Sequence, residues 1–141
     1  MRKLIQGMRR EQAFTLVELM IVVTIVAILA LVAIPLYSQN TVSAIMSEGV
    51  AGCGALRTAC RVYYSENSTY PANLAALVTL DIVGATALNG KYFQQADYTV
   101  TGAATTYTIQ ATAPATAKAA AGMTYIINER GVESGTYLTG Q

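Results

Sequence analysis

An unbroken apolar run dominates the first part of the chain. It extends from Phe14 to Leu36, and Glu18 is its only strongly polar member. As an α-helix the run would be about 35 Å long, enough to cross the hydrocarbon core of a bilayer. A buried core helix is the alternative, but in so small a domain such a helix would be shorter and amphipathic. The pattern therefore predicts a membrane-spanning helix.

After the apolar run, apolar or small residues recur at steps of three and four. This spacing is typical of one face of a helix. The stripe consists of Val42, Met46, Gly49, Cys53, Leu56, Cys60 and Tyr63. We expect the helix to continue out of the membrane to about Ser65 and to lay the stripe against a sheet. Gly49, Gly52 and Gly54 weaken a helix, so we expect them either to allow close packing of the sheet or to cause a bend.

Turn residues divide the rest of the chain into short segments. Residues 67–69 form a breaker cluster, and the Tyr-Pro pair that opens residues 70–77 is suited to starting a short helix. Residues 81–95 indicate an irregular connection, and residues 113–121 a low-complexity link. Four segments alternate apolar and polar residues, as antiparallel strands do: 98–100, 106–111, 123–127 and 132–138.

These patterns together predict an α+β fold. A long N-terminal helix would cross the membrane with its inner half. A small antiparallel sheet of three or four strands would pack on its outer half, because only that half has an amphipathic stripe.

Charged residues are few and unevenly placed. They make up 12% of the chain, compared with roughly 25% in soluble domains. Cations cluster before the apolar run, at Arg2, Lys3, Arg9 and Arg10, whereas residues 37–56 contain none. The N-terminus is therefore expected to stay in the cytoplasm. The remaining cations are scattered, so no nucleic-acid binding is expected.

A cleaved secretory signal peptide has a similar order of cations and apolar residues. Its apolar region is usually only about 7–15 residues long, and a small-x-small cleavage site follows it. Here residues 31–33 read Leu-Val-Ala, with a bulky residue where a small one is needed. A signal peptide is therefore disfavoured.

The residue types used by most enzymes and metal sites are scarce. The chain has no histidine and no glycine-rich phosphate loop after a strand, and two cysteines cannot build a zinc site alone. The acidic residues considered for calcium lack ligand-loop spacing: Asp81, Asp97, Glu129 and Glu133. We therefore expect no enzyme activity, no catalytic residues, no cofactor and no metal site.

Cys53 and Cys60 lie seven positions apart on the expected helix. The helical rise alone separates their Cα atoms by about 10.5 Å, beyond the roughly 7 Å limit for a disulfide. No disulfide within the helix is expected. Because both residues lie on the apolar stripe, buried free thiols are favoured. A bridge to another chain, or one permitted by unwinding at Gly54, remains open.

The junction before the apolar run has its own motif. A hydrophilic stretch ending in Gln12-Ala13 meets Phe14-Thr15-Leu16-Val17-Glu18. This junction resembles that of the type IV prepilin family. The resemblance implies that a membrane-embedded peptidase cuts between Ala13 and Phe14 and methylates the new amine of Phe14. The family usually has Gly before the cut, where this chain has Ala13.

Glu18 is a carboxylate within an apolar segment, which marks it as a functional residue. The resemblance implies that it pairs with the Phe14 amine of a neighbouring copy. A copy in the wrong register would leave a buried unpaired charge, which is strongly unfavourable, so this pair would select the assembly register. The alternative is a Glu18 at the bilayer edge without a partner. Pro35 resembles the family's helix-kinking proline; alternatively, it ends the membrane helix.

The resemblance also implies an organisation and a role. It implies a leader at 1–13, a membrane and assembly helix at 14–36, and a periplasmic or extracellular pilin-like domain at 37–141. The chain would be anchored in the bacterial inner membrane and would then join a type IV pilus-like filament. The partners implied are copies of itself, other pilins, the prepilin peptidase and the inner-membrane assembly platform.

Two other functions stay open. One is a pseudopilin of a type II secretion system. The other, from a different functional class, is a signal-anchored binding domain that never polymerises, and it predicts an uncut leader and a dispensable Glu18.

Overall fold

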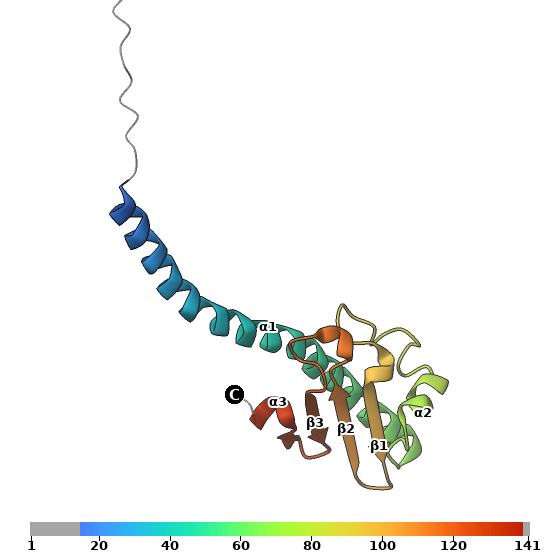
Figure 1. Ribbon diagram of the computed structural model, residues 1–141. Helices are drawn as coiled ribbons and strands as arrows, with labels where there is room; N and C mark the ends of the chain where they lie inside the picture. The colour runs from blue at the N-terminus through green and yellow to red at the C-terminus, as the bar shows by residue number, and fades with distance from the viewer. Residues whose placement is uncertain (1–14, 140–141) are drawn as a thin grey trace, which may run out of the picture. The chain divides into compact units, whose positions relative to one another are not determined.

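The structure is a computed structural model that describes residues 15–139 (Figure 1). The chain divides into two compact units between Tyr37 and Ser38, and each unit is described by itself. The longest element, α1, covers Leu16–Asn67 and so belongs to both units. It continues past Pro35, so that proline does not end the helix.

Helix α1 ends at the predicted breaker cluster. The Asn67 side-chain amide donates to the Tyr63 carbonyl at 3.0 Å, which satisfies one of the last free carbonyls of the helix. Ser68 then takes a φ of 58°, in the left-handed region that commonly follows a helix. The end of the helix is therefore determined by local side-chain chemistry.

The second unit contains a four-stranded antiparallel sheet with the strands in sequence order. The strands are β1 (Tyr98–Gly102), β2 (Tyr107–Thr112), β3 (Thr124–Asn128) and β4 (Glu133–Ser134). In the central register Val100 pairs with Ile109, and Ile109 pairs with Ile127. All three side chains are buried, and their neighbours along each strand are more exposed. This alternation confirms the strand prediction and the α+β class.

The core of the second unit lies between this sheet and the C-terminal half of α1 (Figure 1). From the predicted stripe, Met46, Cys53, Leu56 and Cys60 are fully buried, whereas Val42 and Tyr63 pack at the margin of the core. The predicted helix face is therefore confirmed.

Close packing, one of the two roles predicted for the helix glycines, is observed at Gly49 and Gly52. A Cβ on Gly52 would overlap the Tyr98 hydroxyl oxygen, and one on Gly49 would meet the Phe93 ring at 2.8 Å. Nothing lies within 4 Å of a Cβ at Gly54. The first two glycines therefore let aromatic side chains approach the helix backbone.

The connection between α1 and the sheet is held by one helix carboxylate. Glu48 accepts hydrogen bonds through Oε1 from the backbone N–H groups of Tyr92 (3.0 Å) and Phe93 (2.8 Å). Phe93 is completely buried, and its ring lies 5.7 Å from that of Tyr98. These two charge-assisted hydrogen bonds hold the segment in place, although it forms no helix or strand.

The short helix expected after the breaker cluster has different bounds in the structure. The short helix predicted at 70–77 is α2, at Leu74–Thr79, because Asn73 caps it by accepting from the Ala76 N–H at 3.0 Å. Single 3₁₀ turns cover Gln95–Asp97 (η1) and Ala115–Ala117 (η2).

The strand predicted at 132–138 is wrong for most of its length. Only the two residues of β4 pair with β3, and a short helix, α3 (Thr136–Thr139), follows. Gly135 adopts a φ of 121°, which side chains rarely tolerate, and a Cβ there would overlap the Thr124 carbonyl oxygen. Thr136 Oγ1 then accepts from the Thr124 N–H at 2.9 Å, so a side chain takes the place of a ladder bond.

Candidate functional site

The first unit presents an apolar helical surface on all sides. Every leucine, isoleucine, valine, methionine and tyrosine of Leu16–Tyr37 is at least 52% exposed, the lowest value being that of Ile25. The Thr24 hydroxyl donates back to the Met20 carbonyl at 2.8 Å and so adds no free donor to the surface. By length and composition α1 is apolar enough to cross a membrane, and it is the one such helix among residues 15–139.

The start of α1 is capped by a pair of reciprocal hydrogen bonds. The Thr15 hydroxyl accepts from the Glu18 N–H at 3.2 Å, and Glu18 Oε2 accepts from the Thr15 N–H at 2.9 Å. The Thr15 hydroxyl also donates to Glu18 Oε2 at 2.8 Å. This is a capping box, which satisfies donors that a helix start leaves free.

The capping box gives Thr15 a role that the sequence reasoning missed. A Thr followed three positions later by Glu, just before an apolar run, is the sequence signature of this motif and would have revealed it. Thr15 holds the Glu18 carboxylate at the N-terminal end of the helix. A negative charge is favourable there, because the helix dipole places partial positive charge at that end.

The residues singled out from the sequence do not form one constellation. Ala13 and Phe14, the residues on either side of the expected cut, lie outside the described residues. Glu18 is exposed at the start of α1, whereas Cys53 and Cys60 belong to the core of the second unit.

Both cysteines are fully buried and unpaired. Burial in apolar surroundings raises the pKa of each thiol to about 12. Because the thiolate is the reactive form, these groups are unreactive at neutral pH and act as small apolar side chains.

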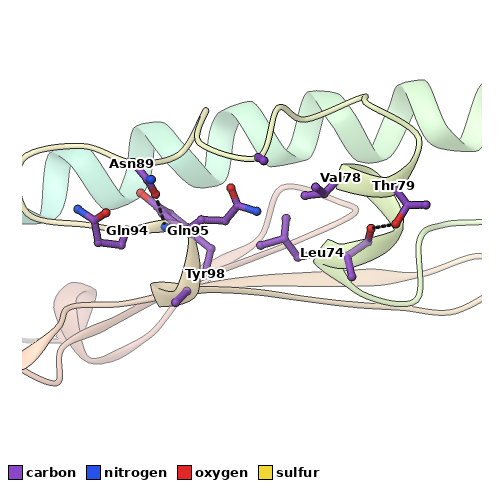
Figure 2. Close-up of a pocket in the computed structure, with 10 residues that line it drawn as sticks. Leu74, Val78, Thr79, Asn89, Gln94, Gln95 and Tyr98 are labelled. Atoms are coloured by element: carbon purple, nitrogen blue, oxygen red, sulfur yellow. Dashed lines mark hydrogen bonds between the residues drawn. The ribbon is translucent and has the colours of Figure 1, made fainter.

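A cavity of about 630 Å³ lies between α2 and residues 89–98 (Figure 2). Figure 2 shows side chains of α2, Leu74 and Val78 among them, on one side and the carboxamides of Gln94 and Gln95 on the other. No charged side chain lines it. Across residues 15–139, no group of three or more acidic, cysteine or histidine side chains is arranged to hold a metal ion. The apolar helix and its capped end therefore remain the candidate site.

Comparison with known proteins agrees with this choice. Residues 8–34 match the family described as the prokaryotic N-terminal methylation motif. This match spans the capped helix start and most of the apolar stretch.

Three relatives extend the likeness into the second unit. A fimbrial protein of Neisseria meningitidis (serogroup A) is 36% identical over 87 residues, which cover 62% of this chain and 49% of the relative. The type IV major pilin protein PilE1 of Neisseria gonorrhoeae is 39% identical over 84 residues, 60% of this chain and 38% of the relative. The type II secretion system core protein G of Vibrio cholerae is 40% identical over 75 residues, 51% of each chain.

The chain spans about half the length, or less, of the curated relatives it matches. This chain carries the N-terminal methylation motif and is similar, at identities above one third, to a fimbrial protein, a type IV major pilin and a type II secretion core protein.

Proposed function

We propose that this chain is a structural subunit of a type IV pilus-like filament, assembled through its apolar N-terminal helix. The observation that carries the proposal is the helix surface of residues 16–37, which is apolar and exposed on every side. Leaving such a surface in water is unfavourable by roughly 25 cal/mol per Å². Lipid can cover it before assembly, and other copies can cover it afterwards.

The proposed maturation step is a cut between Ala13 and Phe14, followed by methylation of the new Phe14 amine. The methylation motif at residues 8–34 supports this step. The cut would remove the four cations at the N-terminus and create one cation, the Phe14 amine, at the start of the helix. The leader would then be 1–13, the assembly helix 14–36 and the exported domain 37–141.

The proposed register mechanism pairs Glu18 with the Phe14 amine of a neighbouring copy. In the single chain the carboxylate is already satisfied in part by Thr15, which lowers the cost of holding it in an apolar setting. In the correct register, the Phe14 amine of the neighbouring copy places a positive charge beside the Glu18 carboxylate. A copy in another register would lack this charge. Pro35 remains proposed as a kink, since its missing N–H loosens the helix there.

Before assembly the chain is proposed to be anchored in the bacterial inner membrane with its N-terminus in the cytoplasm. The clustered N-terminal cations support this orientation. The proposed partners are other copies and other pilins, the prepilin peptidase and the assembly platform. A pseudopilin role is the second candidate, favoured by the likeness to the secretion core protein of Vibrio cholerae.

The proposal is tested by the mass of the mature protein and by a Glu18 variant. Mass spectrometry should find a chain that begins at an N-methylated Phe14. Glu18→Gln should abolish sheared surface fibres while the monomer stays in the membrane. Glu66→Gln, a change of the same chemistry on an exposed side chain of the second unit, should leave the fibres intact.

The result that removes the proposal is a mature chain still carrying Met1. Normal fibres from Glu18→Gln would refute the register mechanism alone. Abundant long fibres indicate a pilus, whereas processed protein without surface fibres indicates the secretion role.

A further inference from the structure

Asn89 and Gly90 form the one Asn-Gly pair of the sequence, in the connection between α2 and β1. An asparagine that precedes glycine is prone to spontaneous deamidation, because glycine has no side chain to shield its backbone nitrogen and its backbone bends easily. Both residues are exposed, so solvent can supply the base and the water that the reaction needs. The proposed function makes no use of this pair.

Deamidation would begin at the Gly90 nitrogen. This nitrogen loses its proton to solvent and attacks Asn89 Cγ; the new C–N bond forms, the bond from Cγ to the side-chain nitrogen breaks, and ammonia leaves with a proton. The product is a five-membered succinimide, which water opens. Opening at Cγ gives aspartate, and opening at the main-chain carbonyl gives isoaspartate. In sum, one amide and one water become one carboxylate and one ammonium ion.

The folded segment engages both reacting groups in hydrogen bonds. The Gly90 N–H donates to the Phe93 carbonyl at 2.8 Å. Asn89 Oδ1 accepts from the Gln95 N–H at 2.9 Å, a bond drawn in Figure 2. The first bond stabilises the N–H form of the nucleophile, and the second fixes the orientation of the carboxamide. Attack therefore requires that this segment first opens.

The segment is held closed from α1. Phe93, whose carbonyl binds the Gly90 N–H, is completely buried, and its own N–H donates to Glu48 Oε1 at 2.8 Å. Gly90 itself lies against this carboxylate, since a Cβ on Gly90 would overlap Glu48 Oε1. The reactivity of Asn89 is therefore tied to the contact between Glu48 and this connection.

Deamidation would add a second carboxylate beside Glu48. Glu48, Asn89 and Gly90 line one cavity of about 250 Å³, and like charges on one small cavity repel each other. Lys91 lies over the Tyr92 ring at 4.9 Å and forms no ion pair with Glu48 in the part of the chain that the structure describes. The isoaspartate form also adds one carbon to the main chain, which shifts the hydrogen-bonding groups that follow it.

We propose that Asn89-Gly90 is a latent modification site that makes opening of this segment irreversible. While the segment is closed, the bonds to Phe93 and Gln95 suppress succinimide formation. Each opening exposes the pair to reaction, and the resulting carboxylate repels Glu48 and hinders closing. The inference concerns the second unit alone and does not depend on filament assembly, so a failure of either proposal leaves the other standing.

The first test compares deamidation in the folded and the unfolded full chain. The protein is incubated in mildly alkaline buffer, either folded in detergent or unfolded in guanidinium chloride, and peptide mapping by mass spectrometry follows the conversion of Asn89. We expect the folded chain to deamidate at least about tenfold more slowly, because only the open fraction reacts. Equal or faster conversion in the folded chain overturns the proposal.

The second test uses Glu48→Ala, which removes the acceptor of the Phe93 N–H. The rate of deamidation at Asn89 should rise by the same factor as hydrogen exchange at the Gly90 amide, about tenfold or more. Glu66→Ala, which removes an exposed carboxylate from the same helix, is the matched control and should leave both rates at the wild-type values.

Faster exchange in Glu48→Ala without faster deamidation would show that opening does not control the reaction, and the proposal would fail. Should Glu48→Ala not fold, guanidinium concentrations below the wild-type midpoint allow the same comparison of the two rates in the wild-type chain.

The third test introduces the aspartate product directly. Asn89→Asp should accelerate hydrogen exchange at the Phe93 amide several-fold. The acceleration should be less than about twofold when Glu48→Gln removes the opposing charge but keeps an acceptor. Asn128→Asp makes the same change at the end of β3 and should leave the Phe93 amide unaffected. Equal acceleration in both backgrounds, or none in either, overturns the repulsion between the product and Glu48, and the irreversible opening with it.

Discussion

Replacing Glu48 by Ala should release the segment between α2 and the sheet. The substitution removes the acceptor of two backbone hydrogen bonds, from Tyr92 at 3.0 Å and from Phe93 at 2.8 Å. Phe93 is fully buried, so its N–H is not easily satisfied by water once the carboxylate is gone. Glu48 itself is half-buried.

The size of the effect follows from these contacts. Hydrogen bonds to a charged group contribute about 1.5–3 kcal/mol each, which gives about 3–6 kcal/mol for two. Because Glu48 is partly exposed, solvent screening reduces this to about 2–4 kcal/mol. With a urea m-value of about 1–3 kcal/mol/M, a loss of 3 kcal/mol moves the unfolding midpoint down by about 1–3 M.

The assay is urea unfolding of the full chain in detergent, followed by near-UV circular dichroism of the tyrosines. Hydrogen exchange at the Tyr92 and Phe93 amides gives a local reading and should accelerate by about tenfold or more in Glu48→Ala. Glu66→Ala, which removes an exposed carboxylate from the same helix, should change stability by less than about 0.5 kcal/mol. If Glu48→Ala unfolds at the wild-type midpoint with unchanged exchange at both amides, the attribution of this stability to Glu48 is refuted.

Two further predictions concern the core. Gly52→Ala should destabilise the chain by about 1–3 kcal/mol, because its Cβ would overlap the Tyr98 hydroxyl. Gly54→Ala, with open space around it, should stabilise the chain by up to about 1 kcal/mol. Thermal unfolding of both variants checks this pair, and equal shifts in their melting temperatures would contradict the packing account. Cys53 and Cys60 should resist alkylation until the chain unfolds. Because the folded pKa of each thiol, about 12, exceeds the ordinary value of 9.0, the free energy of unfolding should fall as pH rises from about 9 to 12. If a double Cys→Ala variant loses stability with pH at the same rate, other groups are responsible.

Short-range patterns carried most of the correct expectations. The apolar run and the stripe through Met46, Cys53 and Cys60 have the helical period, and the buried face agrees with them. The strand segments that alternate over several residues pair in the observed sheet. The strand predicted at 132–138 failed because Gly135 adopts a left-handed conformation against the Thr124 carbonyl, a contact between residues that are not close in sequence.

The candidate site also has one feature that local sequence could reveal and one that it could not. The Thr15–Glu18 capping box is encoded in four consecutive residues and was available to sequence reasoning. The expected pairing of Glu18 with Phe14 involves a second chain and a residue outside the described range, so it remains a prediction.

By itself, the sequence determined where the chain is apolar on all sides and where it is amphipathic, because these properties depend on neighbours within a few positions. Only the tertiary structure decided that Glu48 holds the segment around Phe93 and that Gly52 lets Tyr98 approach the helix. Each of these contacts joins residues more than forty positions apart, and no local period reports which distant group will approach a given side chain.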